Sequence, residues 1–206
     1  MLSILNKENP SGWCESRALK SGNVSHYWCW NILVTLNVKI NGFRFDYGVG
    51  GIHGSVESTI VRSDEDDIIV DADVSSMYPN IAIVNNTYPQ HLSKKFCEIY
   101  ENVYITRKSF GKGTPENAVM KLALNGVYGD SNNKFSPFYD PQYTMTITIN
   151  GQLSLSILAE KLIMNIPSVR IIQVNTDGVT VKLNRKDVDL YHKLCKEWEK
   201  ETKILS

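Results

Sequence analysis

Two spacings of apolar residues divide the chain into predicted strands and predicted helices. Alternation of apolar and polar residues, or a short apolar run, is typical of a strand, and a recurrence every three or four residues is typical of an amphipathic helix. The strand pattern covers residues 28–40, 43–47, 68–70, 143–149, 169–174 and 179–183. The helical pattern covers residues 93–109, 115–128, 150–165 and 185–201. The chain is therefore predicted to combine both kinds of element.

Turn residues separate the first two predicted strands and follow the second. Asn41-Gly42 is a strong signal for a two-residue hairpin turn. A group of glycines with Gly50-Gly51 at its centre follows residue 47. It predicts either a flexible turn or a glycine loop whose bare backbone lets a nucleic-acid strand approach closely.

The stretch 68–80 combines an apolar strand with a carboxylate and a turn of small residues. Ile68 to Val70 read as a buried strand, Asp73 follows, and a Tyr-Pro pair closes the turn at Pro79. A carboxylate on a rigid element, beside backbone N–H groups, suits a metal that bridges a phosphate. The alternative is an aspartate that caps a turn or helix.

Composition narrows the class of protein. The 206 residues predict one or two domains, and 22 basic against 22 acidic residues leave nucleic-acid binding open. The four cysteines are scattered, so a structural zinc site is not expected. The longest apolar stretch, 27–40, is too short and too polar to span a membrane, and no signal peptide is recognised.

Two further stretches carry candidate chemistry. Four basic residues lie across the helices predicted at 93–109 and 115–128: Arg107, Lys108, Lys112 and Lys121. Such a run is either a solvated face or a surface for an anion. The tetrad Asn175-Thr176-Asp177-Gly178 lies between two predicted strands, where Asp-Gly is also a common hairpin turn.

Three segments, taken in order, resemble the three polymerase motifs of the family B DNA polymerases. Asp73-Val-Ser-Ser-Met-Tyr-Pro-Asn80 is similar to Asp-x-x-Ser-Leu-Tyr-Pro-Ser. Lys121-Leu-Ala-Leu-Asn-Gly-Val-Tyr-Gly129 resembles Lys-x-x-x-Asn-Ser-x-Tyr-Gly. Asn175-Thr-Asp-Gly178 is similar to Asp-Thr-Asp-Ser. Gly50-Gly51 lies where phage enzymes of the family carry a glycine loop, and the short insert between the first two motifs looks like the bacteriophage type.

The resemblance implies template-directed DNA synthesis with two Mg²⁺ ions. Asp73 and Asp177 would be the catalytic carboxylates and metal ligands, with the Val74 carbonyl as a further ligand. The residues implied to bind the nucleotide are Ser76, Met77, Tyr78, Arg107, Lys108, Lys112, Lys121 and Asn125. Those implied to lie near the DNA are Gly50, Gly51, Tyr128, Gly129 and Thr176. Tyr78 would lie under the sugar and exclude a 2′-hydroxyl.

The chain departs from the family pattern in its third motif and in its length. Asn175 replaces an aspartate, and Gly178 replaces a serine and is expected to loosen the turn. The length leaves no room for an exonuclease domain or a full thumb, so a fragment or a companion polypeptide is expected. An apolar edge at Trp198 and Leu205 is expected where those parts are missing.

We therefore predict an α+β fold, with an antiparallel palm sheet, helices on one face and a short helical fingers hairpin. Residues 1–57 would lead into the palm, 58–84 and 129–206 would form it, and 85–128 would form the fingers. The expected partners are a DNA primer–template and deoxynucleoside triphosphates, in the cytoplasm, that of the host if the gene belongs to a phage. The alternatives are a non-catalytic remnant that binds nucleic acid or assists assembly, and a generic metal-dependent nuclease.

Overall fold

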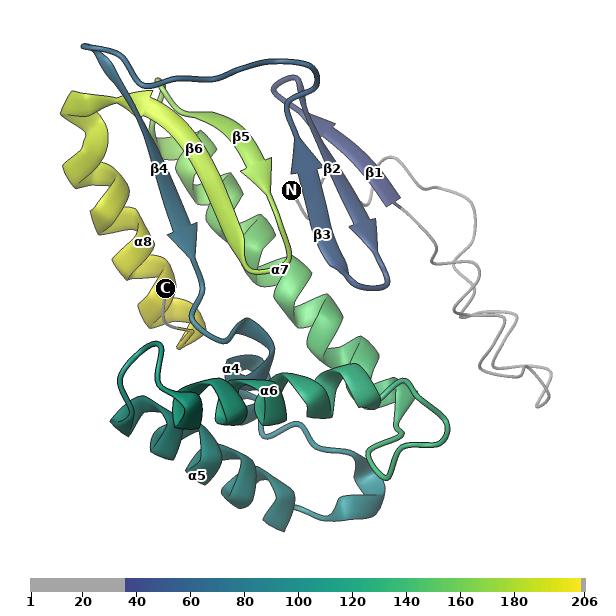
Figure 1. Cartoon of the computed structure of the whole chain (residues 1–206). Helices are drawn as coiled ribbons and strands as arrows, with labels where there is room; N and C mark the ends of the chain where they lie inside the picture. Colours follow the sequence, from purple (N-terminus) through teal and green to yellow (C-terminus); the bar gives the residue numbers. More distant parts are fainter. Residues whose placement is uncertain (1–35, 205–206) are drawn as a thin grey trace, which may run out of the picture.

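A computed structural model describes residues 36–204 (Figure 1). It confirms the α+β class, with one six-stranded antiparallel sheet and five α-helices in this part of the chain. The strands are β1 (Leu36–Ile40), β2 (Phe43–Gly48), β3 (Gly51–Ser55), β4 (Asp67–Asp73), β5 (Arg170–Val174) and β6 (Gly178–Asn184). The helices are α4 (Met77–Val84), α5 (Lys95–Ser109), α6 (Pro115–Asp130), α7 (Pro141–Asn165) and α8 (Val188–Thr202), with short 3₁₀ turns η1 (Gln90–Leu92) and η2 (Arg185–Asp187).

The sheet order is β1-β2-β3-β5-β6-β4. The predicted hairpin at Asn41-Gly42 is confirmed: both residues have positive φ, 49° and 83°, as a tight turn between twisted strands requires. β5 and β6 form the second predicted hairpin, and β4 pairs with β6 along its whole length. The predicted strand at 28–40 is confirmed only for Leu36–Ile40, since residues 28–35 lie outside the described part.

The prediction of an irregular glycine loop after residue 47 is wrong beyond Gly50. Gly51 to Ser55 form β3, which pairs with β2 on one side and with β5 on the other. Glycines lower strand propensity, which hid this strand from the sequence pattern. Gly54 is required by packing, because a Cβ there would lie 2.4 Å from the Arg44 carbonyl oxygen.

The predicted strand at 143–149 is also wrong, because these residues belong to the 25-residue helix α7. Asp140 caps this helix by accepting hydrogen bonds from the backbone N–H groups of Gln142 and Tyr143, and Pro141 occupies the first turn. The buried positions Tyr143, Thr144, Ile147, Thr148 and Gly151 follow helical spacing. β-Branched residues made the segment resemble a strand.

Helices α7 and α8 lie along one face of the sheet, as predicted (Figure 1). Trp198 of α8 is fully buried, and its indole N–H donates to the Ser154 carbonyl oxygen at 2.9 Å. The expectation of an uncovered apolar edge at Trp198 is therefore wrong, because α7 covers this side chain. Leu205 lies outside the described residues.

Helices α5 and α6 form an antiparallel hairpin beyond the lower end of the sheet (Figure 1). The inner side of α5 carries Cys97, Tyr100 and Tyr104, which are buried. Ile99 of the same helix is 56% exposed. Among residues 36–204, no helix is both long enough and apolar enough to cross a membrane.

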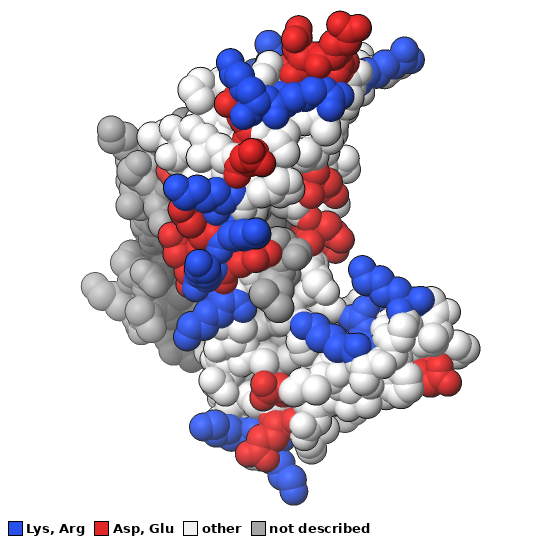
Figure 2. Space-filling model, turned by 90° about the vertical axis from the view of Figure 1, so that its left-hand side faces the viewer, with Lys and Arg blue, Asp and Glu red and all other residues white. Residues whose placement is uncertain are grey.

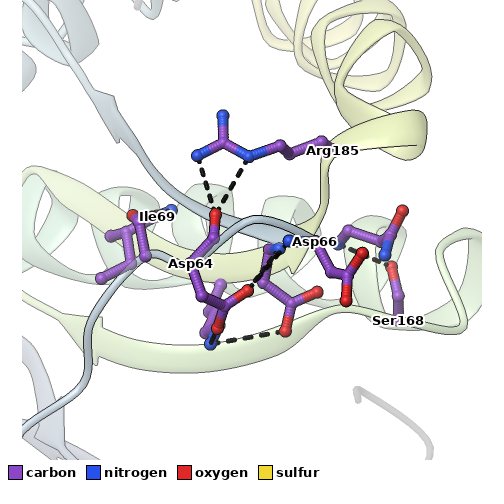
Figure 3. A network of polar contacts seen from close by, with 9 residues as sticks. Asp64, Asp66, Ile69, Ser168 and Arg185 are labelled. Carbon is purple, nitrogen blue, oxygen red and sulfur yellow. Dashed lines mark hydrogen bonds and ion pairs between the residues drawn. The ribbon is translucent and has the colours of Figure 1, made fainter.

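A polar network closes the opposite end of the sheet, where β4 begins and β6 ends (Figure 3). One Asp64 carboxylate oxygen accepts from the backbone N–H groups of Asp66 and Asp67, and the other accepts from Lys182 at 2.7 Å. The Arg185 guanidinium donates twice to the Asp64 carbonyl oxygen. The acidic run 64–67 is thus used in fastening a loop to β6.

Candidate active site

A cleft of about 810 Å³ lies between the lower end of the sheet and the α5–α6 hairpin. Its lining comes from five places: the end of β4 with the start of α4, the β5–β6 hairpin, the end of α5, the loop between α5 and α6, and α6. The lining residues are Asp73, Val74, Ser75, Ser76, Met77, Tyr78, Arg107, Lys112, Gly113, Asn117, Ala118, Lys121, Asn125, Tyr128, Thr176 and Asp177. In Figure 2 the molecule is hollowed between its upper and lower parts, with acidic side chains on the wall above and basic side chains below.

Strand pairing brings the two predicted catalytic carboxylates together. Asp73 ends β4 opposite Gly178, and the Val74 N–H donates to the Asp177 carbonyl oxygen at 2.7 Å. Burial raises the pKa of Asp73, and the charge of Asp177 raises it further, while Lys121 and Lys112 act in the opposite direction. Segments distant in sequence thus place mutually repelling carboxylates in one cleft.

The oxygen atoms available beside Asp73 and Asp177 are of the kind that bind a hard cation. Carboxylates from Asp73 and Asp177, with the Val74 carbonyl, are the oxygen ligands that Mg²⁺ prefers. A cation between the two carboxylates would remove the repulsion that raises the Asp73 pKa. Within residues 36–204 no group of three or more His, Cys, Asp or Glu could hold a metal ion, so any site here needs main-chain or substrate oxygens as well.

The turn after Asp73 opens helix α4. Ser76, in the left-handed region at φ 52°, is the cap residue of α4, which has no side-chain cap. Asp73 therefore does not cap α4, so the helix-cap form of the alternative interpretation is wrong. The buried Asn80 holds the turn from inside, because its side-chain amide donates to the Ser75 carbonyl oxygen. The first N–H groups of α4, at Met77 and Tyr78, lie in the cleft wall, where a helix N-terminus favours an anion.

The basic wall of the cleft comes from α5, α6 and the loop between them. Arg107 donates to the Ser76 hydroxyl at 2.5 Å and to the Asn117 side-chain oxygen at 3.3 Å. Lys112 and Lys121 also line the cleft. Lys108 does not, because its ammonium lies 4.4 Å from the centre of the Tyr104 ring.

Asn117 lines the cleft but was not identified from the sequence. It donates to the Arg107 and Phe110 carbonyl oxygens and so joins α6 to the end of α5. Asn117, Lys121 and Asn125 recur every four residues on α6, and this spacing was the signal available in the sequence.

Tyr78 and Tyr128 form an aromatic pair at the floor of the cleft. Their ring centres are 4.0 Å apart, and the Tyr128 hydroxyl is hydrogen-bonded to that of Thr148 at 2.7 Å. The Tyr78 hydroxyl donates to the Gly50 carbonyl oxygen at 2.6 Å. Burial, and then Tyr128, raise the pKa of Tyr78 above that of a free phenol, so it stays protonated at neutral pH.

The residues predicted to lie near DNA are only partly brought together. Thr176 and Tyr128 line the cleft, and Gly50 and Gly51 adjoin it through Tyr78. Gly129 is exposed on α6 outside the lining. Gly178, which is expected to loosen its turn, is buried, and a Cβ there would lie 3.0 Å from the Ala72 carbonyl oxygen. The assigned roles in binding and catalysis stay predictions.

Comparison with known proteins gives a likeness of fold only. No protein-family model matches the chain, and no curated protein matches it. Among solved structures it is similar to the family B DNA polymerase from the hyperthermophilic archaeon Pyrobaculum calidifontis, at 16% identity and a TM-score of 0.45. The match covers 74% of this chain and 26% of that chain. A likeness this distant carries no argument about chemistry, so the function is inferred from the site itself.

Proposed function

We propose that the chain catalyses template-directed addition of deoxynucleotides to a DNA primer. The observation that carries this proposal is the pairing of Asp73 and Asp177 on one wall of a cleft whose other wall presents Arg107, Lys112 and Lys121. A nucleoside triphosphate with bound metal is complementary in charge to this cleft. Its anionic phosphates would face the basic wall, and its metal ion would face the two carboxylates. The motif resemblance adds the class of reaction.

The residues of the chain divide the work by charge. Asp73 and Asp177 would hold Mg²⁺, which when bound would supply the positive charge that stabilises the attacking and leaving oxygens. Lys112, Lys121 and Arg107 bind the triphosphate, and the N–H groups at the start of α4 add backbone donors. Arg107 already donates to Ser76, so its guanidinium is held at the mouth of that turn.

Tyr78 limits the space beside the sugar. Its ring lies in the cleft lining between the nucleotide-facing turn and Tyr128. A deoxyribose placed over this ring leaves no volume for a 2′-hydroxyl. The base would then rest near Tyr128, whose own hydroxyl is occupied by Thr148.

Primer extension with purified protein tests the proposal. We expect Mg²⁺-dependent extension by the wild type and a loss of about 10²–10³-fold in Asp73→Asn and Asp177→Asn, the scale seen when one preorganised charge is removed. Asp66→Asn, at the opposite end of the sheet, is the control and should extend normally. Asn175→Asp should also remain active. Extension that survives both Asp73→Asn and Asp177→Asn would refute the proposed function.

The second candidate is a remnant that binds nucleic acid without catalysis. It is favoured by Asn175, which places a neutral side chain beside the carboxylate pair. Its outcome in the same assay is DNA binding without extension, even when Mg²⁺ is in excess. A chain that extends primers excludes it.

The proposal includes a companion polypeptide that carries a thumb and an exonuclease, in a polymerase of bacteriophage type. Support comes from the spacing of the three motifs along the chain. The test is processivity: a thumb-bearing polypeptide should lengthen the products made per binding event. Unchanged product length, with long tracts made by this chain alone, would contradict it.

A further inference from the structure

The turn between β2 and β3 is a junction that the motif comparison does not explain. Its residues 48–51 touch α4 through Tyr78, α7 through Gln152, and the β5–β6 hairpin through Thr176. The three elements are distant in sequence and surround one short turn. Two of them carry residues of the candidate active site.

Gln152 of α7 fastens this turn. Its side-chain NH₂ group donates to the Gly48 carbonyl oxygen at 2.6 Å and to the Gly51 carbonyl oxygen at 2.9 Å. Each amide proton thus has an acceptor, one at either end of the turn. The contact spans about a hundred residues of sequence and joins the helical layer to the hairpin tip. Because the side chain is half-buried, water competes for these bonds less than it would at the surface.

The other side of the same turn holds Tyr78. The Gly50 carbonyl, between the two that Gln152 binds, accepts from the Tyr78 hydroxyl at 2.6 Å. Gly51 has φ +142°, and a Cβ there would lie 3.1 Å from that hydroxyl and 3.1 Å from the Thr176 methyl group. The position of the Tyr78 ring therefore depends on where the turn is held.

We propose that Gln152 is a positioning residue for sugar selection, acting on Tyr78 through the Gly48–Gly51 turn. The inference rests on the proposed function, since it concerns which sugar the cleft accepts. With the turn fixed, the Tyr78 ring is fixed at its hydroxyl end and by Tyr128 at its face. With the turn loose, the ring shifts and admits a 2′-hydroxyl. Gln152 lies outside the cleft lining.

The test compares variants that break the same link at two places. Gln152→Met keeps the length of the side chain but removes both donors. Tyr78→Phe removes only the hydroxyl that binds Gly50. The matched control is Asn150→Ala on the same helix, whose amide donates only to the Thr146 carbonyl oxygen of α7. For each protein, single-nucleotide addition gives kcat/KM for a deoxynucleotide and for the ribonucleotide of the same base.

We expect the preference for the deoxynucleotide to fall about five- to ten-fold in Gln152→Met and in Tyr78→Phe, the scale of one hydrogen bond. The variant that carries both Gln152→Met and Tyr78→Phe should lose no more of this preference than each single variant, because both substitutions break the same chain of contacts. Asn150→Ala should keep the wild-type ratio. Amide hydrogen exchange at Val49 to Gly51 should quicken in Gln152→Met, a readout independent of synthesis.

Two outcomes would overturn the inference. A wild-type ratio in folded Gln152→Met, or a double variant whose effects add, shows that Gln152 does not act through Tyr78. If Gln152→Met fails to fold, an unchanged ratio of the two kcat/KM values in Tyr78→Phe is by itself enough to overturn the inference. If the wild type extends no primer, the proposed function fails. That failure is distinguishable from a failure of the inference about Gln152, because the hydrogen-exchange measurement still reports whether Gln152 holds the turn.

Discussion

At the residue scale, Gly50 and Gly51 are adjacent glycines with different physical requirements. Gly51 has φ +142° and no room for a Cβ between Tyr78 and Thr176, whereas a Cβ on Gly50 would meet nothing within 4 Å. We expect Gly51→Ala to destabilise the fold by about 1–3 kcal/mol, from a strained backbone. Gly50→Ala should cost less than about 0.5 kcal/mol. Urea unfolding of both variants checks this, and equal costs would contradict it.

The Asp73 carboxyl should titrate abnormally when Mg²⁺ is absent. Its pKa is raised by burial, then by Asp177, then by Asp71. It should therefore still bind a proton at pH values where an ordinary aspartate is ionised. Asp71→Asn removes one repelling charge and should lower the Asp73 pKa, while the Thr180 hydroxyl keeps its acceptor.

Carboxyl ¹³C chemical shifts across a pH series measure this titration directly. Asp66→Asn, at the far end of the sheet, is the control. A rise of the Asp73 pKa in Asp71→Asn would show that the two side chains do not repel each other. Added Mg²⁺ should lower the same pKa, because a cation favours the ionised form.

At the element scale, the cap of α7 joins two elements. One Asp140 oxygen accepts from Gln142 and Tyr143, and the other accepts from the Gln90 N–H at 2.9 Å. We expect Asp140→Ala to lower the free energy of unfolding by about 1–2 kcal/mol and Asp140→Asn to lower it less. Thermal unfolding of both variants is the measurement, and an Asp140→Ala protein as stable as wild type would refute the capping role.

The polar network at the start of β4 should stabilise the fold less in acid than at neutral pH (Figure 3). A hydrogen bond from Lys182, and then one from the Asp67 N–H, lower the pKa of Asp64 below the ordinary 3.8. A carboxyl with a lowered folded-state pKa stabilises the fold above its unfolded pKa. That contribution is lost as the pH falls through the lower, folded value.

Asp64→Asn should therefore unfold at a lower temperature than wild type at neutral pH, with the difference shrinking as the solution is acidified below about pH 4. Glu65→Gln, one residue along the same loop, is the control. The effect should be small, because Asp64 is exposed and water screens the ion pair. A difference that grows on acidification would have the wrong sign for this mechanism.

The elements most clearly predicted by the sequence are those whose signals are local. Asn41-Gly42 demands positive φ at both residues, and Pro115 with Glu116 suits the first turn of α6, so both were located without tertiary information. β3 was missed because its two glycines are fixed by packing against β2 and Tyr78. The first half of α7 was misread because β-branched residues lie on a helix that the Asp140 cap and burial stabilise.

Several residues of the candidate site could be predicted from the sequence, but the contacts that hold them in place could not. Asp73, Asp177 and Lys121 could be named from motif spacing; strand pairing brings the two aspartates to the cleft, and α6 contributes Lys121. Nothing in the sequence indicates that Gln152 reaches Gly48, since long-range side-chain contacts leave no periodic trace. Lys108 differs, because its place over Tyr104 is a local contact at a spacing of four residues on α5, and that spacing can be read from the sequence.

At the scale of the whole molecule, charge balance limits how the chain holds DNA. The sequence is formally neutral, and in Figure 2 basic side chains away from the hollow are mixed with acidic ones. Arg107, Lys112 and Lys121 line the cleft, and its lining contains no acidic residue of the α5–α6 hairpin. When no nucleoside triphosphate is bound, these three side chains are available to DNA phosphates, and three such contacts give a slope of about −3 for log affinity against log salt, since each contact to a duplex contributes about −0.9.

We therefore expect primer–template affinity to fall by roughly 40-fold between 50 and 200 mM salt, and Lys112→Ala to reduce the slope by about one. Fluorescence anisotropy with a labelled primer–template measures both, and Lys186→Ala, in η2 at the other end of the sheet, is the control. A slope steeper than about −6 would mean that a second basic surface follows the duplex, because three cleft contacts cannot supply it. The thumb-bearing companion would then be unnecessary for affinity. A slope near −3 that steepens when that polypeptide is added places the missing phosphate contacts on it.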